Sequence, residues 1–180
     1  MDGTVASDRR SLTQATTVGL ASHLGYELLA GVGLPGSGAV GAAPAALAFA
    51  AATVATCRAA GRSGPEGDAA LRLVNGLALG AVGAHLAGWP RRRTAIGLPA
   101  LVECEGMGRD LMPGYNMLLY LPATTAAVGV LLENRSASRW PPLVLAAALV
   151  PLLARVQHRD LAGRRARARR RPDWWHRRLT

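Results

Sequence analysis

The chain has 180 residues, of which 50% are hydrophobic and only 4% are aromatic. Its 21 basic residues are all arginines, and with 11 acidic residues they give a net charge of +10. Two cysteines, Cys57 and Cys104, exclude a disulfide framework and show no metal-binding spacing. The apolar residues stand in long blocks and do not alternate with polar ones, which favours an integral membrane protein over a soluble domain.

Five apolar segments follow one another along the chain, and about 20 such residues suffice to cross the hydrocarbon core of a bilayer. Their approximate bounds are 12–34, 38–57, 71–89, 114–132 and 140–157. Breaks rich in glycine, proline or charged residues separate the first from the second, the second from the third and the fourth from the fifth. The sequence therefore predicts an all-α fold, an integral membrane bundle of about five transmembrane helices within residues 1–158.

The first segment contains SHLGYELLAGVGLP, in which His23 and Glu27 lie four residues apart on one helix face. An ionisable residue inside a span costs about 2.5–3.5 kcal/mol on insertion scales and therefore suggests a function. Because an apolar pocket disfavours the charged form of a carboxyl group, such a group can serve as a general acid. We predict that Glu27 is a catalytic acid whose proton His23 tunes or relays. In the alternative interpretation, the pair only orders the bundle.

The third segment and the stretch that follows it supply further polar candidates. Asn75 and His85 fall on one possible interhelical seam of the third segment. Next comes TAIGLPALVECEGMGRDLMPGYNMLLY, for which we expect a partly re-entrant loop or a short interfacial helix over 95–112. Glu103 and Glu105 point to different sides of a helix, and Glu103 is predicted to be catalytic. The predicted pocket-lining residues are Tyr26, Asn75, His85, Glu105, Tyr115, Asn116 and Tyr120.

The last segment is followed by a strongly basic stretch, residues 159–180, which is predicted to be a cytoplasmic tail. It combines arginines with Trp174 and Trp175, a composition typical of an anchor at a membrane with anionic headgroups. Docking of a partner is the alternative. Nucleic-acid binding is disfavoured because the rest of the chain offers no groove-reading motif.

The distribution of arginines predicts an orientation in the cell membrane. With five spans, seven arginines fall on the side of the N-terminus and fourteen on the side of the C-terminus. The positive-inside rule then places the N-terminus outside and the C-terminus in the cytoplasm. In this orientation Glu27, His85, the 95–112 stretch and the start of the fourth span converge near the inner leaflet.

The residues GYELLAGVGLP resemble a pattern of an aromatic residue, Glu and Leu, then Gly, then Pro. This pattern occurs in an early helix of the small integral membrane terpene cyclases of meroterpenoid and indole-terpenoid pathways. The resemblance covers about a dozen residues and implies that Glu27 is the catalytic acid of a protonation and cyclisation reaction. The better-known members have more helices and a second acid in a late helix, whereas no acidic residue lies inside the last span here. Glu103, Glu105 or Asp110 would have to replace it.

Taken together, these features predict a membrane enzyme that uses intramembrane acid–base catalysis on a hydrophobic, isoprenoid-type substrate. A small proton-coupled transporter or a lipid-binding membrane protein is the alternative, and a structural subunit is a third possibility. The sequence contains no phosphate-binding loop and no acidic magnesium motif. Histidines in two spans are available to ligate a haem, yet their spacing does not require one, so no cofactor and no metal site are predicted.

Overall fold

The computed structural model describes residues 10–134 and 139–180. Most of this part of the chain is helical, and the predicted all-α fold is confirmed. The helices are α1 (Ser11–Ala30), α2 (Ser37–Val40), α3 (Ala42–Ala60), α4 (Pro65–Gly88), α5 (Met112–Leu132) and α6 (Trp140–Arg170). Two short strands, β1 (Arg91–Arg93) and β2 (Pro99–Leu101), form an antiparallel hairpin, and the 3-10 helix η1 (Trp174–His176) follows α6.

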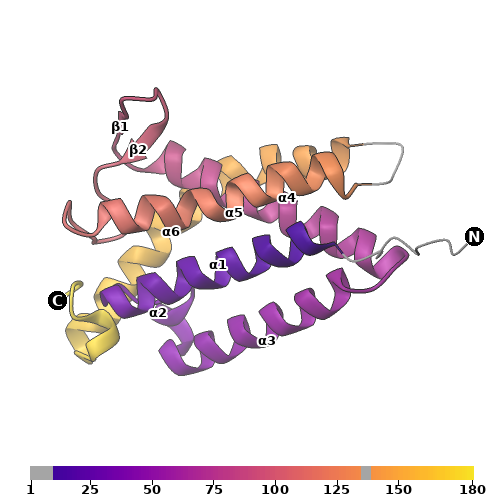
Figure 1. The fold of residues 1–180 in the computed structure, drawn as a ribbon. Helices are drawn as coiled ribbons and strands as arrows, with labels where there is room; N and C mark the ends of the chain where they lie inside the picture. Colours follow the sequence, from indigo (N-terminus) through magenta and orange to yellow (C-terminus); the bar gives the residue numbers. More distant parts are fainter. Residues whose placement is uncertain (1–9, 135–138) are drawn as a thin grey trace, which may run out of the picture.

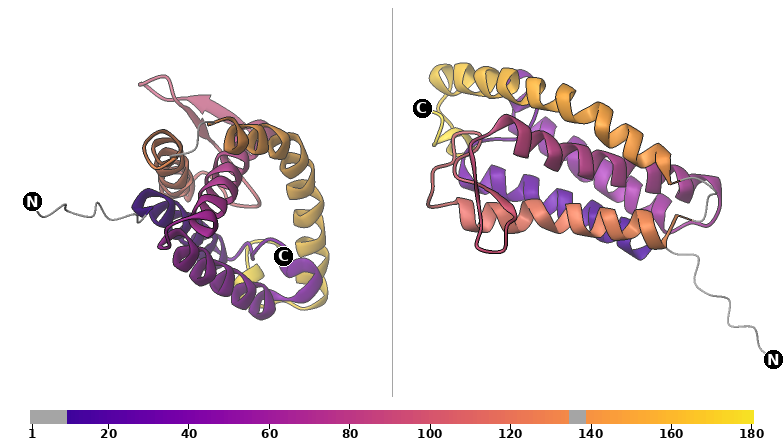
Figure 2. Two further views of the ribbon diagram at one scale, coloured as in Figure 1. Left: turned by 90° about the vertical axis from the view of Figure 1, so that its right-hand side faces the viewer. Right: turned by 90° about the horizontal axis from the view of Figure 1, so that it is seen from above.

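The five long helices form a bundle in which successive helices run in opposite directions (Figure 1). The β-hairpin, α2 and the C-terminus lie at one end of this bundle, which we call the hairpin end. Helix α4 contacts each of the other four long helices. Seen along the bundle and from above, α6 runs along the outside of α4 (Figure 2). Side chains brought to the hairpin end by α4 are therefore enclosed by neighbours from several elements.

Four helices in the described part of the chain, α3, α4, α5 and α6, are long and apolar enough to cross a membrane. Helix α1 has 20 residues but is not among them, because threonines, Gln14, His23 and Glu27 lower its hydropathy. It packs mainly against α5, and its buried positions include Thr13, His23 and Glu27. The membrane character predicted from the sequence thus rests on four helices, with α1 as a more polar fifth member of the bundle.

Glycines allow α4 and α6 to approach each other closely. A Cβ atom added at Gly80 would lie 2.8 Å from the Cβ of Leu149, and one added at Gly76 would lie 3.0 Å from the carbonyl oxygen of Pro142. Small residues four positions apart commonly form such close helix–helix contacts in membranes. The glycines therefore let the backbone of α4 lie directly against side chains and carbonyl oxygens of α6.

The start of α1 is fixed by a carboxylate from another helix. Glu133, at the end of α5, accepts hydrogen bonds from the N–H groups of Leu12 and Thr13 at 2.5 and 2.9 Å. The first N–H groups of a helix have no partner within the helix and need an outside acceptor. Glu133 supplies this acceptor and ties α1 to α5 at the end of the bundle opposite the hairpin end.

Residues 95–111 form no helix, so of the two structures expected for this stretch, the short interfacial helix is wrong. The stretch begins inside the β-hairpin, whose strand β1 precedes it and in which Arg91 pairs with Leu101. Its second part contains a tight turn in which the Met107 N–H donates to the Cys104 carbonyl at 2.7 Å. Glycines with positive φ, at 81° in Gly97 and 91° in Gly106, favour turns over a helix here.

The basic C-terminal stretch is continuous with the bundle. Helix α6 crosses the boundary predicted at residue 158 without a break, and its 31 residues make it about 46 Å long, longer than the roughly 30 Å hydrocarbon core. Beyond it the chain folds back, with His176 fully buried and Leu179 7% exposed. The Arg178 N–H donates to the Gly31 carbonyl at 3.1 Å. Residues 171–180, which we call the C-terminal segment, therefore cover the hairpin end, while Trp174 stays exposed.

Candidate functional site

A group of polar side chains is buried inside the hairpin end of the bundle. We call it the polar cluster, and each of its members is at most 7% exposed. Its members are His23, Glu27, His85, Cys104, Glu105, Tyr115 and Arg164. They come from α1, α4, the turn after β2, α5 and α6. Burying so many ionisable groups is costly unless they are paired with one another or with a ligand.

Glu27 lies at the centre of one half of the cluster. Its Oε1 accepts a hydrogen bond from the Tyr115 hydroxyl at 3.1 Å and lies 3.1 Å from His23 Nε2. Its Oε2 is buried and has no hydrogen-bond partner among the described residues. Helix α1 brings His23 and Glu27 together by their four-residue spacing, and it ends at Gly31 in a left-handed conformation. One oxygen of Glu27 is thus fixed by the protein, and the other is available.

Glu105 lies at the centre of the other half. Its Oε2 is 2.5 Å from Arg164 Nη2, and its Oε1 is 3.6 Å from His85 Nε2. Burial raises the pKa of Glu105, but the contact with His85 and the charge of Arg164 outweigh this effect and lower the pKa to about 2. Arg164 also contacts Asp160 Oδ2 at 2.9 Å and donates to the Val32 carbonyl at 2.8 Å. Glu105 is therefore an ionised carboxylate at neutral pH.

The turn that carries Cys104 and Glu105 has an uncommon backbone. Glu105 has φ of 52°, a left-handed conformation that usually belongs to glycine, and Gly106 follows with φ of 91°. A residue held in such a conformation costs about 1–3 kcal/mol and often marks a functional site. The turn buries Cys104 and Glu105 consecutively, and the Cys104 thiol donates to the Tyr115 oxygen at 3.5 Å. Burial also raises the pKa of the Cys104 thiol well above its ordinary value.

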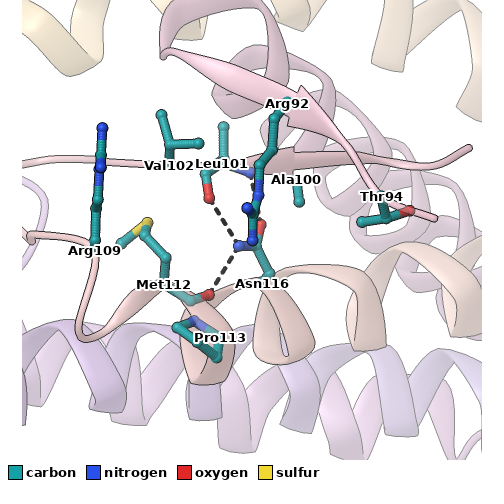
Figure 3. A pocket seen from close by; sticks show the side chains of 9 residues that line it. All are labelled: Arg92, Thr94, Ala100, Leu101, Val102, Arg109, Met112, Pro113 and Asn116. Carbon is teal, nitrogen blue, oxygen red and sulfur yellow. Dashed lines mark hydrogen bonds between the residues drawn. The ribbon is translucent and has the colours of Figure 1, made fainter.

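A cavity of about 470 Å³ lies between the β-hairpin and the start of α5 (Figure 3). Its lining residues are Arg92, Thr94, Ala100, Leu101, Val102, Arg109, Met112, Pro113 and Asn116. Asn116 of α5 reaches β2, and its amide donates to the carbonyls of Leu101 and Met112 at 3.0 and 2.8 Å. Leu101 and Met112 also pack in the same buried core as Cys104 and Tyr115, so the cavity and the polar cluster share this core.

The structure brings several of the predicted site residues together and leaves others apart. His23, Glu27, His85, Glu105 and Tyr115 all belong to the polar cluster. Tyr26 lies next to it, with its ring centroid 6.3 Å from that of Tyr115 and its hydroxyl donating to the Leu111 carbonyl. Asn116 lines the neighbouring cavity.

Three further predicted residues neither belong to the polar cluster nor line the cavity. Glu103 is exposed, because the left-handed turn buries Glu105 and leaves Glu103 outside. Asn75 is fully buried but donates to Thr13 Oγ1 at 3.1 Å, ten residues before His85 and hence about 15 Å away along α4. The Tyr120 hydroxyl contacts the Pro99 carbonyl at the hairpin.

Two members of the polar cluster were not among the residues predicted from the sequence. Cys104 was not singled out, because two cysteines give neither a disulfide framework nor a metal-binding spacing. Arg164 was counted with eight other arginines of the basic stretch. The only local signal for Arg164 is its four-residue spacing from Asp160, which places the two on one face of α6.

Comparison with models of known protein families, with curated proteins and with solved structures finds no match to this chain.

Proposed function

We propose that this chain is an integral membrane enzyme that uses acid–base catalysis on a hydrophobic, isoprenoid-type substrate, with Glu27 as the proton donor. The observation that carries the proposal is the unequal environment of the two oxygens of Glu27. Tyr115 donates to Oε1 and His23 Nε2 lies 3.1 Å from it, whereas Oε2 is buried without a hydrogen-bond partner in the part of the chain that the structure describes. Buried polar atoms are rarely left unsatisfied, so an unpaired one suggests a ligand.

The surroundings of Glu27 suit the protonation of an alkene or an epoxide. A positioned carboxylic acid can deliver a proton to such a group, and nearby aromatic faces stabilise the positive charge that forms. The Tyr115 ring lies 4.7 Å from the His23 ring and 6.3 Å from the Tyr26 ring, measured between centroids. His23 and Tyr115 also hold the carboxyl group in one orientation, which is what a positioned acid needs.

A hydrophobic substrate is consistent with the location of the Glu27 carboxyl group. Four helices of the described chain are apolar enough to cross a membrane, so substrate dissolved in the bilayer has access to the bundle. The neighbouring cavity of about 470 Å³ has the size of a small-molecule site. Leu101 and Met112 line this cavity and pack in the same core as Tyr115, the hydrogen-bond partner of Glu27.

The proposal includes an orientation in which the hairpin end faces the cytoplasm. Arg91, Arg92 and Arg93 of β1 and the arginines of the last turns of α6 lie at this end. Positively charged segments next to spans are retained on the cytoplasmic side and attract anionic lipid.

The test is a product assay in membranes, with mass spectrometry on linear prenylated substrates and their epoxides. We expect wild type to form cyclised isomers and Glu27→Gln to form none, because glutamine keeps the shape of the side chain but has no carboxyl proton to donate. Glu66→Gln is the matched control, since Glu66 is an exposed residue paired with Arg62 far from the cluster. Expression and fold of both variants are compared by size-exclusion chromatography and circular dichroism.

Conversion by folded Glu27→Gln at the wild-type rate would remove Glu27 from the role of the acid. Failure of folded wild type to convert any substrate of the panel would overturn the proposed chemistry. Proton uptake by reconstituted vesicles, sensitive to Glu27→Gln, would then favour a proton-coupled transporter.

A further inference from the structure

The polar cluster places an imidazole, a thiol and a carboxylate side by side at the turn after β2. Arg164 pairs with Oε2 of Glu105, while Oε1 of Glu105 faces His85. Buried polar groups need partners, and one ligand shared by these three side chains would supply them.

Three neighbouring side chains offer the donor atoms of a metal site. His85 Nε2, Cys104 Sγ and a carboxylate oxygen of Glu105 all lie within 4.8 Å of one another. One imidazole nitrogen, one thiolate and one carboxylate oxygen are ligands of Zn²⁺, a borderline-soft cation. Three protein ligands leave a fourth position open, which is the arrangement of zinc sites that bind water or a substrate.

The His85 ring presents an unpaired nitrogen to this site. Nε2 is buried and has no hydrogen-bond partner in the described ranges, although it lies 3.6 Å from Glu105 Oε1. On the opposite edge of the ring, Nδ1 lies 2.8 Å from the Ala81 carbonyl oxygen, which can accept the Nδ1 proton and so leave Nε2 as the ligand atom. A carbonyl at the far nitrogen of a histidine is typical of metal-ligating histidines.

The other two donor side chains are fixed in the same way. Arg164 holds Oε2 of Glu105 at 2.5 Å and leaves Oε1 facing His85. The left-handed backbone at Glu105 buries it together with Cys104, whereas Glu103, two residues earlier, stays exposed. The Cys104 thiol is buried beside this ion pair and contacts the Tyr115 oxygen at 3.5 Å.

We propose that His85, Cys104 and Glu105 bind one divalent metal ion of the zinc class. The sequence shows no metal motif because the three ligands come from the end of α4 and from the turn after β2. His23, Glu27 and His85 also lie within 4.8 Å of one another, so the ion would be a neighbour of the proposed acid. The inference goes beyond the proposed function, and it is tested without any substrate.

The first measurement is the metal content of the full chain, purified in detergent without chelators, loaded with Zn²⁺ and desalted. We expect inductively coupled plasma mass spectrometry to find about one zinc ion per chain. Replacement of zinc by Co²⁺ provides a spectroscopic test, because a cobalt–thiolate bond absorbs in the near ultraviolet. We expect this absorption in wild type.

Matched variants identify the ligands. Cys104→Ser is expected to lose the cobalt–thiolate absorption, and Cys57→Ser, which changes the other cysteine of the chain, is expected to keep it. Glu105→Gln and His85→Gln are expected to weaken zinc binding at least tenfold, whereas the exposed Glu103→Gln is expected to bind as wild type does. Circular dichroism shows which variants are folded.

The wild-type measurement alone can overturn the proposal, whatever the variants do. Absence of stoichiometric metal and of the cobalt–thiolate absorption in folded wild type would overturn it. Metal binding that survives Cys104→Ser and Glu105→Gln but is lost in His23→Gln would place the ion with His23, Glu27 and His85 and overturn the assigned ligands. Folded wild type that takes up no metal after zinc loading would refute this inference and leave the proposed function intact.

Discussion

At the scale of single residues, Arg164 connects three parts of the chain. Its guanidinium contacts Glu105 in the turn after β2, Asp160 on its own helix and the Val32 carbonyl just beyond α1. The side chain is 1% exposed, so these contacts replace water completely. Removing one partner of a buried ion pair leaves the other charge uncompensated, which costs more than the pair itself contributes.

We therefore predict that Arg164→Ala lowers the free energy of unfolding by about 3–5 kcal/mol, because Glu105 is left buried without its partner. Arg165→Ala is the control, since the neighbouring Arg165 is exposed and its loss should change stability little. Unfolding in a denaturing detergent, followed by circular dichroism, measures both variants. Equal stability of the two variants would show that the Arg164–Glu105 contact contributes nothing to the fold.

At the scale of elements, the contact between α4 and α6 depends on residues without side chains. Gly80 leaves no space for a methyl group, because its added Cβ would lie 2.8 Å from the Leu149 Cβ and 3.2 Å from the Ala146 carbonyl. Gly25 of α1, by contrast, has nothing within 4 Å of its added Cβ. Both glycines lie inside helices, so alanine improves the helix propensity equally at the two positions.

Gly80→Ala is expected to destabilise the protein by about 1–3 kcal/mol, because the two helices must move apart. Gly25→Ala is expected to be neutral or to stabilise it by up to about 1 kcal/mol through helix propensity. Thermal unfolding in the same detergent compares the two variants. A destabilised Gly25→Ala together with an unchanged Gly80→Ala would contradict the α4–α6 contact described above.

The C-terminal segment is docked through a histidine that is sensitive to pH. Burial lowers the pKa of His176 below its ordinary value of 6.5, and the charges of Arg164 and Arg167 on α6 act in the same direction, against Asp173. The docked segment therefore favours neutral His176. When the pH falls below about 6.5, the released segment gains a proton that the docked segment disfavours, and docking weakens.

We predict that amide hydrogen exchange within residues 171–180 becomes faster between pH 7.5 and pH 5.5, after correction for the intrinsic rate. The Arg178 N–H, which donates to the Gly31 carbonyl, should lose protection in this range. His176→Gln should remove the pH dependence, because glutamine does not titrate. Protection that is independent of pH in wild type would contradict this role of His176.

At the scale of the whole molecule, the sequence predicted the helices better than their contacts. Apolar blocks and breakers define α3 to α6 because lipid requires continuous apolar surface, and the His23–Glu27 spacing fixes a local pair. The choice of Glu105 over Glu103, and of Arg164 over its neighbours, depends on a left-handed turn and on packing between distant elements. The displacement of Asn75 from the site follows from its partner Thr13, which no periodicity reveals.

The origin of Arg164 in α6 has a consequence for the biosynthesis of the protein. The ribosome synthesises Glu27 and Glu105 before α6, the last long helix that the structure describes. The guanidinium that pairs with Glu105 belongs to this helix. The Glu105–Arg164 pair therefore cannot form before α6 has been synthesised. Until then Glu105 lacks its guanidinium partner, and the turn at Cys104 lacks the neighbour that α6 provides.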